Sequence, residues 1–431
     1  MTELTRFDYW LNDDRVAALT ARQLLEPVEG PDGVIFPPTF AAEEEDANGN
    51  YNIDSFGGAY SARIDYTPPK QASVITDIRH ESGRNVCLVD SVGAEANRIE
   101  PLFKLDKCNG RFSGLVPQVT VKAGSRTVNL LDAGHRAGDA IIRFTKYGER
   151  LFNAFKALSE ANNAYELAKL APTSLVFGVW DSRGTQEKIQ RAFRSVVRAT
   201  NVVPLTRSAQ YNRATKYVEY GILNEELDKG KGKDSVFARE GFKDNPATRV
   251  PGGVLVNGEI RRDMTINLSA IRRLRVPLEF DPTKDDPDKT LALRRYILGL
   301  CLIAALARSE DRYNLREGCQ LRMKPGSKME WREVHFEGDD VALTDLTESV
   351  AKAYAEAAAE AFGVGESCEV EFDSKTAEKW LALDKKQQDK LRRDKPMTQQ
   401  FASDGAADAT GDGNGTDAGD TKPARRKRRG S

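Results

Sequence analysis

A dense group of basic side chains follows an apolar run in the middle of the chain. Between positions 181 and 216, eight lysines and arginines stand against two acids, although the whole chain carries a net charge of −1. Charge segregated in this way creates a local positive field that attracts polyanions. The first part of the group contains Lys188, Arg191, Arg194 and Arg198. These residue types indicate binding of phosphate groups.

The spacing of these basic residues predicts a helix over 185–200. At about 100° per residue, their side chains fall on one face, and the apolar Ile189, Phe193 and Val197 fall on the opposite face. Charges one turn apart, about 5.4 Å, can match successive phosphates of a single nucleic-acid strand. An ordinary helix with a solvated arginine face has the same pattern, so that alternative stays open.

The loop before this helix, DSRGTQ at 181–186, is suited to holding an anion. Its glycine permits close approach of a backbone, and the free N–H groups at a helix start bind anions. The loop could instead hold a catalyst at Asp181 or a nucleophile at Ser182. No general base adjoins either residue, and the motif is not G-x-S-x-G. The anion-binding candidates are Arg183, Gly184, Thr185 and Gln186.

Further candidates extend the predicted nucleic-acid interface. Arginine mixed with amide and aromatic side chains combines charge with stacking surface for single strands. A second basic cluster, Arg261–Arg262 and Arg272–Arg273–Arg275, is opposed only by Asp263. A salt bridge between Arg98 and Glu95 is an equal alternative for Arg98. The additional candidates are Arg207, Gln210, Tyr211, Asn97, Arg98, His135, Arg136, Arg272 and Arg273.

Several classes of protein are disfavoured by what the chain lacks. The five cysteines are scattered without a Cys-x-x-Cys pair, and the three histidines lie far apart, so neither a metal nor another cofactor is expected. No phosphate-binding G-x-x-x-x-G-K-[ST] motif occurs. The apolar run at 296–307 is shorter than the roughly 20 residues of a membrane span. An acidic N-terminus without an apolar core predicts a cytoplasmic protein with reduced thiols.

The elements that would position these residues alternate between helices and strands. Residues 10–26 read as a helix, and 59–67 alternate like a half-exposed strand. A buried strand at 86–90 runs into a helix with Asp90 or Ser91 as its N-cap. The remaining expected elements are strands at 115–122 and 126–131, a helix at 149–170, a strand at 173–180, a basic segment at 269–275, a helix at 291–308, a strand at 319–323, a helix at 344–362 and a strand at 367–372.

An Asn257–Gly258 pair between β-rich runs predicts a hairpin over 253–268, because both residues tolerate positive φ. Helices mixed with a hairpin favour an α+β fold. A ferredoxin-like or RNA-recognition-type core, β-α-β-β-α-β with insertions, fits this order. Its pieces would lie at about 85–210 and 250–372 of a domain spanning 1–395. Residues 396–431, acidic and then basic, read as a disordered tail that either touches nucleic acid or only solubilises the chain.

Four segments together resemble a known family. They are CLVDSVGAEANRIE, LLDAGHRAGDAIIR, TSLVFGVWDSRGTQEKIQRAFRSVVRATNVVPLTRSAQY and LRRYILGL. They look like the backbone (RAMP-type, Cas-seven family) subunit of the type I-G CRISPR Cascade, formerly called type I-U. The resemblance spreads from about residue 8 to 370, and Val197 stands where isoleucine is expected. The tail after 396 is not explained by the family pattern.

The resemblance implies a role as well as a fold. It implies an RNA-recognition-motif palm with finger insertions and a hairpin thumb, polymerised as several copies along the spacer of a guide RNA (crRNA). The guide would then pair with target DNA in antiviral defence, beside a large subunit and a fused repeat-processing and capping subunit, away from any membrane. Such subunits are not nucleases, so no catalytic residue is expected.

Two alternatives remain beside this expectation. Related type III backbone subunits cut RNA with an aspartate, so a metal-dependent RNA-cleaving subunit using a loop aspartate such as Asp181 is the first. A stand-alone RNA chaperone or structural protein is the second. Guide binding itself must be sequence-neutral, so phosphate contacts and stacking should dominate over base reading.

Overall fold

The computed structural model describes residues 2–38, 41–42, 51–52, 86–209, 215–231, 234–243, 247–309, 312–391 and 395–400. Its strands are β1 Val16–Pro27, β2 Val34–Ile35, β3 Ala41–Ala42, β4 Tyr51–Asn52, β5 Val86–Asp90, β6 Val119–Ala123, β7 Arg126–Asn129, β8 Val179–Trp180, β9 Lys188–Ile189, β10 Phe193–Thr200, β11 Val202–Ala209, β12 Ala247–Val256, β13 Ile260–Asn267, β14 Asn314–Arg316, β15 Cys319–Met323, β16 Glu330–His335, β17 Val341–Leu343 and β18 Cys368–Glu371. Its α-helices are α1 Asp8–Asn12, α4 Val92–Ile99, α5 Ala140–Arg143, α6 Lys146–Ala161, α7 Tyr165–Leu170, α8 Pro172–Phe177, α9 Val236–Arg239, α10 Leu268–Arg272, α11 Pro287–Leu306, α12 Glu348–Phe362, α13 Ser374–Ala382 and α14 Lys385–Leu391.

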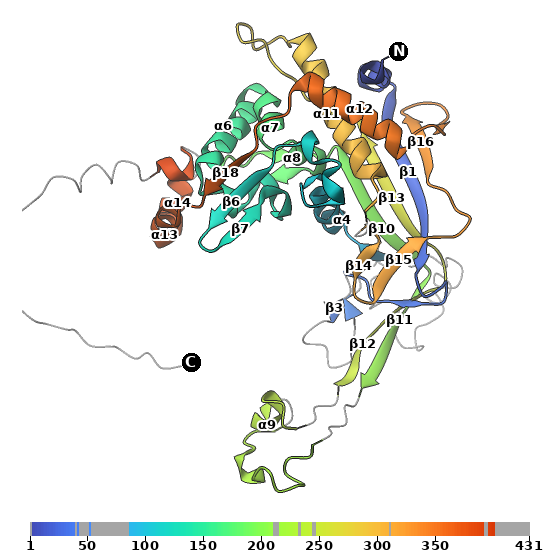
Figure 1. Ribbon diagram of the computed structural model, residues 1–431, viewed down its shortest axis with the longest axis vertical. Helices are drawn as coiled ribbons and strands as arrows, with labels where there is room; N and C mark the ends of the chain where they lie inside the picture. Colours follow the sequence, from blue (N-terminus) through green and yellow to red (C-terminus); the bar gives the residue numbers. More distant parts are fainter. Residues whose placement is uncertain are drawn as a thin grey trace, which may run out of the picture.

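The fold is mixed α+β and is built on one curled antiparallel sheet of eight strands (Figure 1). The strands follow the order β14-β15-β1-β13-β10-β5, and β16 pairs with β1 beside β15 and carries β17. The central strand β1 therefore pairs with β13 on one side and with β15 and β16 on the other. Every strand pair in this sheet is antiparallel.

Helices cover one face of this sheet. The apolar helix α11 is buried along most of its length and packs against α12, α8 and the strands β10 and β13. Helix α4 packs on β10, and α10 packs on β1. The core between these helices and the sheet contains large side chains that solvent does not reach, among them Trp10, Phe177 and Tyr296. The position of the helices leaves the other face of the sheet for the candidate site.

Two long strands continue from this sheet into a projecting arm (Figure 1). β10 runs through Asn201 into β11, and its partner runs from β12 through Asn257–Gly258 into β13. Pairing is maintained across the junction, because Ala199 opposes Ile260 and Val202 opposes Val256. The arm ends in a small tip with helix α9, where Tyr217, Phe237 and Phe242 pack edge to face.

A smaller unit lies beside the main core (Figure 1). Its sheet has the order β18-β6-β7, with β18 parallel to β6. Helices α6, α13 and α14 accompany it, and Met397 packs with Phe144 and Trp380 in a separate apolar cluster. Residues 395–400 are thus part of the packed structure, while residues 401–431 of the expected tail lie outside the described residues.

Several elements match the expectations from sequence. The strand at 86–90 is confirmed, and the Ser91 side chain accepts a hydrogen bond from the Ala94 N–H as the predicted N-cap of α4. The strand at 319–323 and the helices expected at 291–308 and 344–362 are confirmed as β15, α11 and α12. The strands near 115–122, 126–131 and 367–372 are present as β6, β7 and β18.

Other expectations are wrong in an instructive way. Residues 16–26 of the expected helix 10–26 lie in strand β1, and most of the helix expected at 185–200 forms β9 and β10. The strand expected at 173–180 is mainly the buried helix α8. The helix expected at 149–170 is broken into α6 and α7 at Asn162, which has φ +52°. The strand expected at 59–67 lies outside the described residues.

The expected hairpin over 253–268 is also wrong. The chain does not reverse at Asn257–Gly258 but runs on from β12 into β13, and each strand pairs with a different neighbour. Glycine is required there for another reason. A Cβ at Gly258 would lie 2.5 Å from the Thr200 carbonyl oxygen, so the two strands could not approach as closely as they do.

Candidate nucleic-acid interface

The face of the main sheet opposite the helices carries a polar and mainly basic layer. Along β13, buried residues alternate with half-exposed ones, because successive side chains of a strand point to opposite faces. Strand register places the residues of this face, among them the buried Val196, in rows across four strands. One row is Arg194, Thr265, Thr20 and Arg332, the next is Val196, Asp263, Arg22 and Glu330, and the third is Arg198, Arg261 and Leu24.

We call this layer the open basic face. Its arginines are Arg22, Arg194, Arg198, Arg261 and Arg332, and its acids are Asp263 and Glu330. Arg194 and Arg332 are exposed, and the side chain of Arg22 is 58% exposed. Since neighbouring strands lie about 4.8 Å apart, these side chains form one continuous positive surface.

Asp263 lies between three guanidinium groups of the open basic face. Its carboxylate is 3.0 Å from Arg261 Nε, 3.7 Å from Arg22 Nε and 3.8 Å from Arg198 Nη1. Burial lowers the pKa of Arg198, Asp263 raises it, and the neighbouring Arg194 and Arg261 lower it further, with a net lowering. One carboxylate therefore holds three positive side chains together without neutralising them.

A buried ion-pair network lies directly beneath this face, between β13, β10 and α4. Arg262 is 1% exposed, and its Nε donates to Glu95 Oε2 at 2.7 Å and to Ser195 Oγ at 2.9 Å. Ser195 Oγ also donates to Glu95 at 2.5 Å. Burial alone would raise the pKa of Glu95, but Arg262, the Ser195 hydroxyl and Arg98 outweigh it and lower the pKa.

Arg98 completes this network, so its predicted salt bridge is present. Its Nη1 lies 3.1 Å from Glu95 Oε1 and also pairs with Asp90. Burial raises the pKa of Asp90 to about 6, although Arg98 lowers it. Arg98 thus contacts two internal carboxylates, and its side chain is 16% exposed.

The loop at 181–187 is organised around Asp181. This residue is 4% exposed, and its Oδ2 accepts hydrogen bonds from the Thr185 N–H at 2.7 Å and from the Thr185 hydroxyl at 3.0 Å. The Asp181 carbonyl accepts from the Gln186 N–H at 3.0 Å. A Cβ on Gly184 would lie 2.3 Å from Asp181 Oδ2. Since this loop leads into a strand, it does not form the helix N-terminus expected for anion binding.

The remaining predicted residues occupy several places. Arg136 is buried, pairs with Glu100 at 2.6 Å and donates to Asn97 Oδ1 at 3.2 Å. His135 is exposed and lies 3.3 Å from Asp139. Arg272 donates to the carbonyls of Trp10, Asp13 and Val16, so its guanidinium is used inside the fold.

Five candidates lie at the surface away from these contacts. Lys188 lies over the exposed Trp180 ring at 5.8 Å, and Arg207 lies 5.6 Å from the Phe36 ring centroid at the arm. Arg183, Arg191 and Arg273 are exposed. Gln210 and Tyr211 lie outside the described residues. Arg194 and Arg198 are the predicted residues that the structure brings together, on the open basic face.

Sequence reasoning missed Arg22 and Arg332 of this face. Both stand on strands, with Arg22 between buried Ala21 and Gln23 and Arg332 between buried Trp331 and Glu333. That alternation is a signal for a strand with one open side. For Arg22 it was obscured by interpreting residues 10–26 as a helix.

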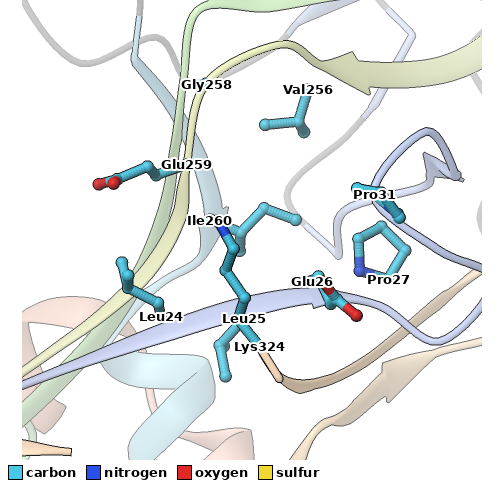
Figure 2. A pocket seen from close by; sticks show the side chains of 10 residues that line it. All are labelled: Leu24, Leu25, Glu26, Pro27, Pro31, Val256, Gly258, Glu259, Ile260 and Lys324. Atoms are coloured by element: carbon cyan, nitrogen blue, oxygen red, sulfur yellow. The ribbon is translucent and has the colours of Figure 1, made fainter. Parts of the chain in front are cut away.

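A small pocket lies beside the open basic face where the arm begins (Figure 2). Leu24, Leu25, Pro27, Val256 and Ile260 form most of its apolar wall. Lys324, Glu26 and Glu259 stand around it (Figure 2). The pocket marks the junction between main sheet and arm, and its lining contains no nucleophile paired with a base.

The described part of the chain also bears on metal sites and on membrane-spanning helices. Within those residues, no group of three or more His, Cys, Asp or Glu side chains is arranged to hold a metal ion. None of the helices seen there combines the length and apolar character needed to cross a bilayer.

Residues 19–204 match the family described as CRISPR-associated protein GSU0053. No curated protein matches the chain. The matched region contains β5, β10, most of β1 and the loop at 181–187. It also contains Asp90 and Glu95, the two carboxylates of the buried ion-pair network. This match indicates a CRISPR-associated protein with a role in CRISPR defence.

Proposed function

We propose that this protein is a non-catalytic backbone subunit of a type I-G Cascade and that its open basic face grips the phosphates of a guide RNA. The observation that carries the proposal is the layer of five arginines, three of them around Asp263, on a sheet face that the helices leave uncovered. The match to a CRISPR-associated family supplies the setting in which such a face would meet RNA.

The strand order supports an RNA-recognition-type palm. Of the elements that form or cover the central part of this sheet, the chain supplies β1 first, then helices α4 and α8, then β10 and β13, then helix α11, and then β15 and β16, while the other strands lie in insertions between them. In the sheet, β15 and β16 flank β1, which is followed by β13 and then β10. This is the order of a β-α-β-β-α-β unit, in which the first and third strands are central. β5 extends the palm beyond β10.

The chemistry of the open basic face suits a ligand of any sequence. Arginine and threonine side chains offer donors to phosphate oxygens, which carry no sequence information. A guide held by its backbone keeps its bases available, and the exchange into a guide–target heteroduplex is nearly balanced energetically. Modest contacts from each copy are therefore sufficient to hold the guide ready for target DNA.

The arm suits the role of a thumb. It projects from the palm, and its tip is folded around Asp228, which accepts from the Ser235 hydroxyl and the Phe237 N–H. Tyr220, Ile222 and Leu227 are exposed on this tip. Exposed apolar side chains at the end of an arm favour protein contacts. We assign them to assembly with other copies of the chain, the large subunit or the repeat-processing subunit.

The test replaces Arg22, Arg194 and Arg332 together with alanine. Log affinity falls with log salt, and loss of three phosphate contacts should make this slope shallower by about 2 for single-stranded RNA. A matched control replaces Arg126, Arg150 and Lys156, which lie on β7 and α6 and change the net charge equally. Unchanged RNA affinity and salt slope in the first variant, or an equal loss in the control, would overturn the assignment.

A further inference from the structure

A loop before α11 presents an aromatic side chain almost wholly to solvent. Phe280 is 96% exposed, and neighbouring Leu278 is 38% exposed. The loop is nevertheless well built, because Leu278 N donates to Lys284 O at 2.9 Å and Lys284 N donates to Asp281 O at 3.0 Å. An exposed aromatic on a defined loop is typical of an interface anchor, since it buries a large area at low entropic cost.

The charge around Phe280 restricts what it can bind. Residues 277–286, which we call the knob, contain Glu279, Asp281, Asp285 and Asp286 against Lys284. Arg275 pairs with Asp285 at the base of the knob at 2.5 Å. Phosphates would be repelled by this excess of acid, so nucleic acid is a poor partner. The chemistry fits a basic surface that contains an apolar recess.

The same chain has such a recess at the other end of α11. An open pocket there is lined by Pro101, Leu102 and Cys108, and its basic residues are Arg98, Lys107, Arg111 and Arg308. The acid Asp106 also lines it, and Glu348 at its edge pairs with Arg111 at 2.7 Å. Arg308 has 91% of its side chain exposed. Arg98 and Arg111 are paired with carboxylates of the fold, so the positive charge that this pocket presents to solvent lies mainly at Arg308, beside its apolar lining.

We propose that the knob of one copy docks, with Phe280 as its anchor, into the Arg308 pocket of a second copy. Asp286 caps the start of α11, and Arg308 follows its end. The helix has 20 residues, so the two surfaces lie about 30 Å apart at 1.5 Å per residue. The knob and the pocket of one and the same chain therefore cannot contact each other. Because the contact is heterologous, each copy offers a free knob and a free pocket, and assembly continues as an open row.

This inference deepens the assembly part of the proposed function and rests on it, but it does not require RNA. The direct test is Leu278→Cys in the full chain, because Leu278 is 38% exposed on the knob and the variant keeps Phe280, and native Cys108 is half-exposed in the pocket. Mild oxidation should give a ladder of dimers, trimers and longer products on non-reducing gels. A Leu278→Cys/Cys108→Ser variant should lose every product beyond the dimer. Phe336→Cys, at a side chain also exposed, serves as a matched control without a ladder.

A second measurement follows self-association by sedimentation. Phe280→Ala and Arg308→Glu should each weaken it at least tenfold, as expected for loss of an interface anchor. Glu279→Lys should weaken it as well, and combining it with Arg308→Glu should restore part of the loss. The proposal is overturned if no ladder forms and if self-association is unchanged in these variants. The same result is expected if Phe280 binds a different protein instead of a second copy.

The two proposals fail in distinguishable ways. An RNA short enough for one copy should bind Phe280→Ala as tightly as it binds the unmodified chain, because the knob is not part of the open basic face. If the open-face triple variant retains RNA while Leu278→Cys still forms the ladder, only the RNA assignment is wrong. If short RNA binds through the open face while no ladder forms, only the knob assignment is wrong.

Discussion

Replacing Glu95 with alanine should be among the most destabilising single changes in the main core. Glu95 is 1% exposed and is the acceptor for both Arg262 and Ser195. At 2.7 Å and an effective dielectric constant of about 20, the attraction between Glu95 and Arg262 is about 6 kcal/mol before the cost of burying both charges. Burial offsets most of that gain while the pair is intact.

The cost appears when one partner is removed. Arg262 would keep its charge at 1% exposure without its carboxylate, so the free energy of unfolding should fall by about 3–5 kcal/mol. With an unfolding entropy of about 2.1 cal/mol/K per residue over roughly 340 residues, this corresponds to a fall of about 4–7 °C in Tm. Calorimetry on the purified chain measures both quantities.

A double variant separates the pair from its surroundings. Glu95→Leu with Arg262→Met should recover at least half of the loss, because no unpaired charge is left buried. Glu369→Gln, which breaks an exposed pair with Lys122, should leave Tm unchanged within about 1 °C. The reasoning is refuted if Glu95→Ala costs less than about 1 kcal/mol, or if the double variant loses the sum of both single losses.

Three further predictions follow from the site and its surroundings. Asp263→Asn should steepen the salt dependence of RNA binding by up to about 0.7 in the log–log slope, because it removes the carboxylate that competes with phosphate; a flatter slope would contradict this. Burial raises the pKa of Glu100 to about 7 despite Arg136, so the folded state keeps a proton that the unfolded chain loses near pH 4.5. The free energy of unfolding should therefore fall as pH rises from about 4.5 to 7, and Glu100→Gln should remove this decline in pH-dependent denaturation curves. Gly184→Ala should lower Tm through a clash with the Asp181 carboxylate, and Gly114→Ala, where a Cβ meets nothing within 4 Å, is its control.

Sequence alone was sufficient for elements whose signals are local. The Ser91 cap fixes the start of α4 by a single side-chain hydrogen bond to the Ala94 N–H. The long apolar run and Pro287 define α11, because Pro is favoured in the first turn of a helix. These features depend on residues close in the chain, which is the range over which sequence patterns operate.

The sequence patterns gave wrong predictions for elements whose conformation depends on pairing between strands far apart in the chain. In β10, Val196 and Val197 are both buried, although their side chains point to opposite faces of the sheet. Buried residues on both faces remove the strict alternation of a half-exposed strand, and the remaining apolar positions imitate a helical face. The β-branched residues at 196, 197, 200, 202 and 203 were the contrary signal.

The candidate site was found in part for a related reason. Arg194 and Arg198 were selected for phosphate binding as members of a helix face, yet they lie together because residues two or four apart share a face of a strand. Their neighbours Arg22 and Arg332 come from positions more than 100 residues away, and only strand register brings them into the same rows. No local pattern contains that register.

The paired strands β10–β11 and β12–β13 run without a break from the main sheet into the arm, so the two parts move as one unit. The same strands carry Arg198 and Arg261 in the main sheet and then form the shaft of the arm. The Thr200 N–H donates to the Glu259 carbonyl and the Asn257 N–H to the Asn201 carbonyl, so the junction is itself hydrogen-bonded. A force applied to the tip is therefore transmitted as twist to the two strands that space those arginines. Contact between the arm and a neighbouring copy of the chain would therefore change the spacing of these arginines and, with it, the proposed affinity for the guide RNA.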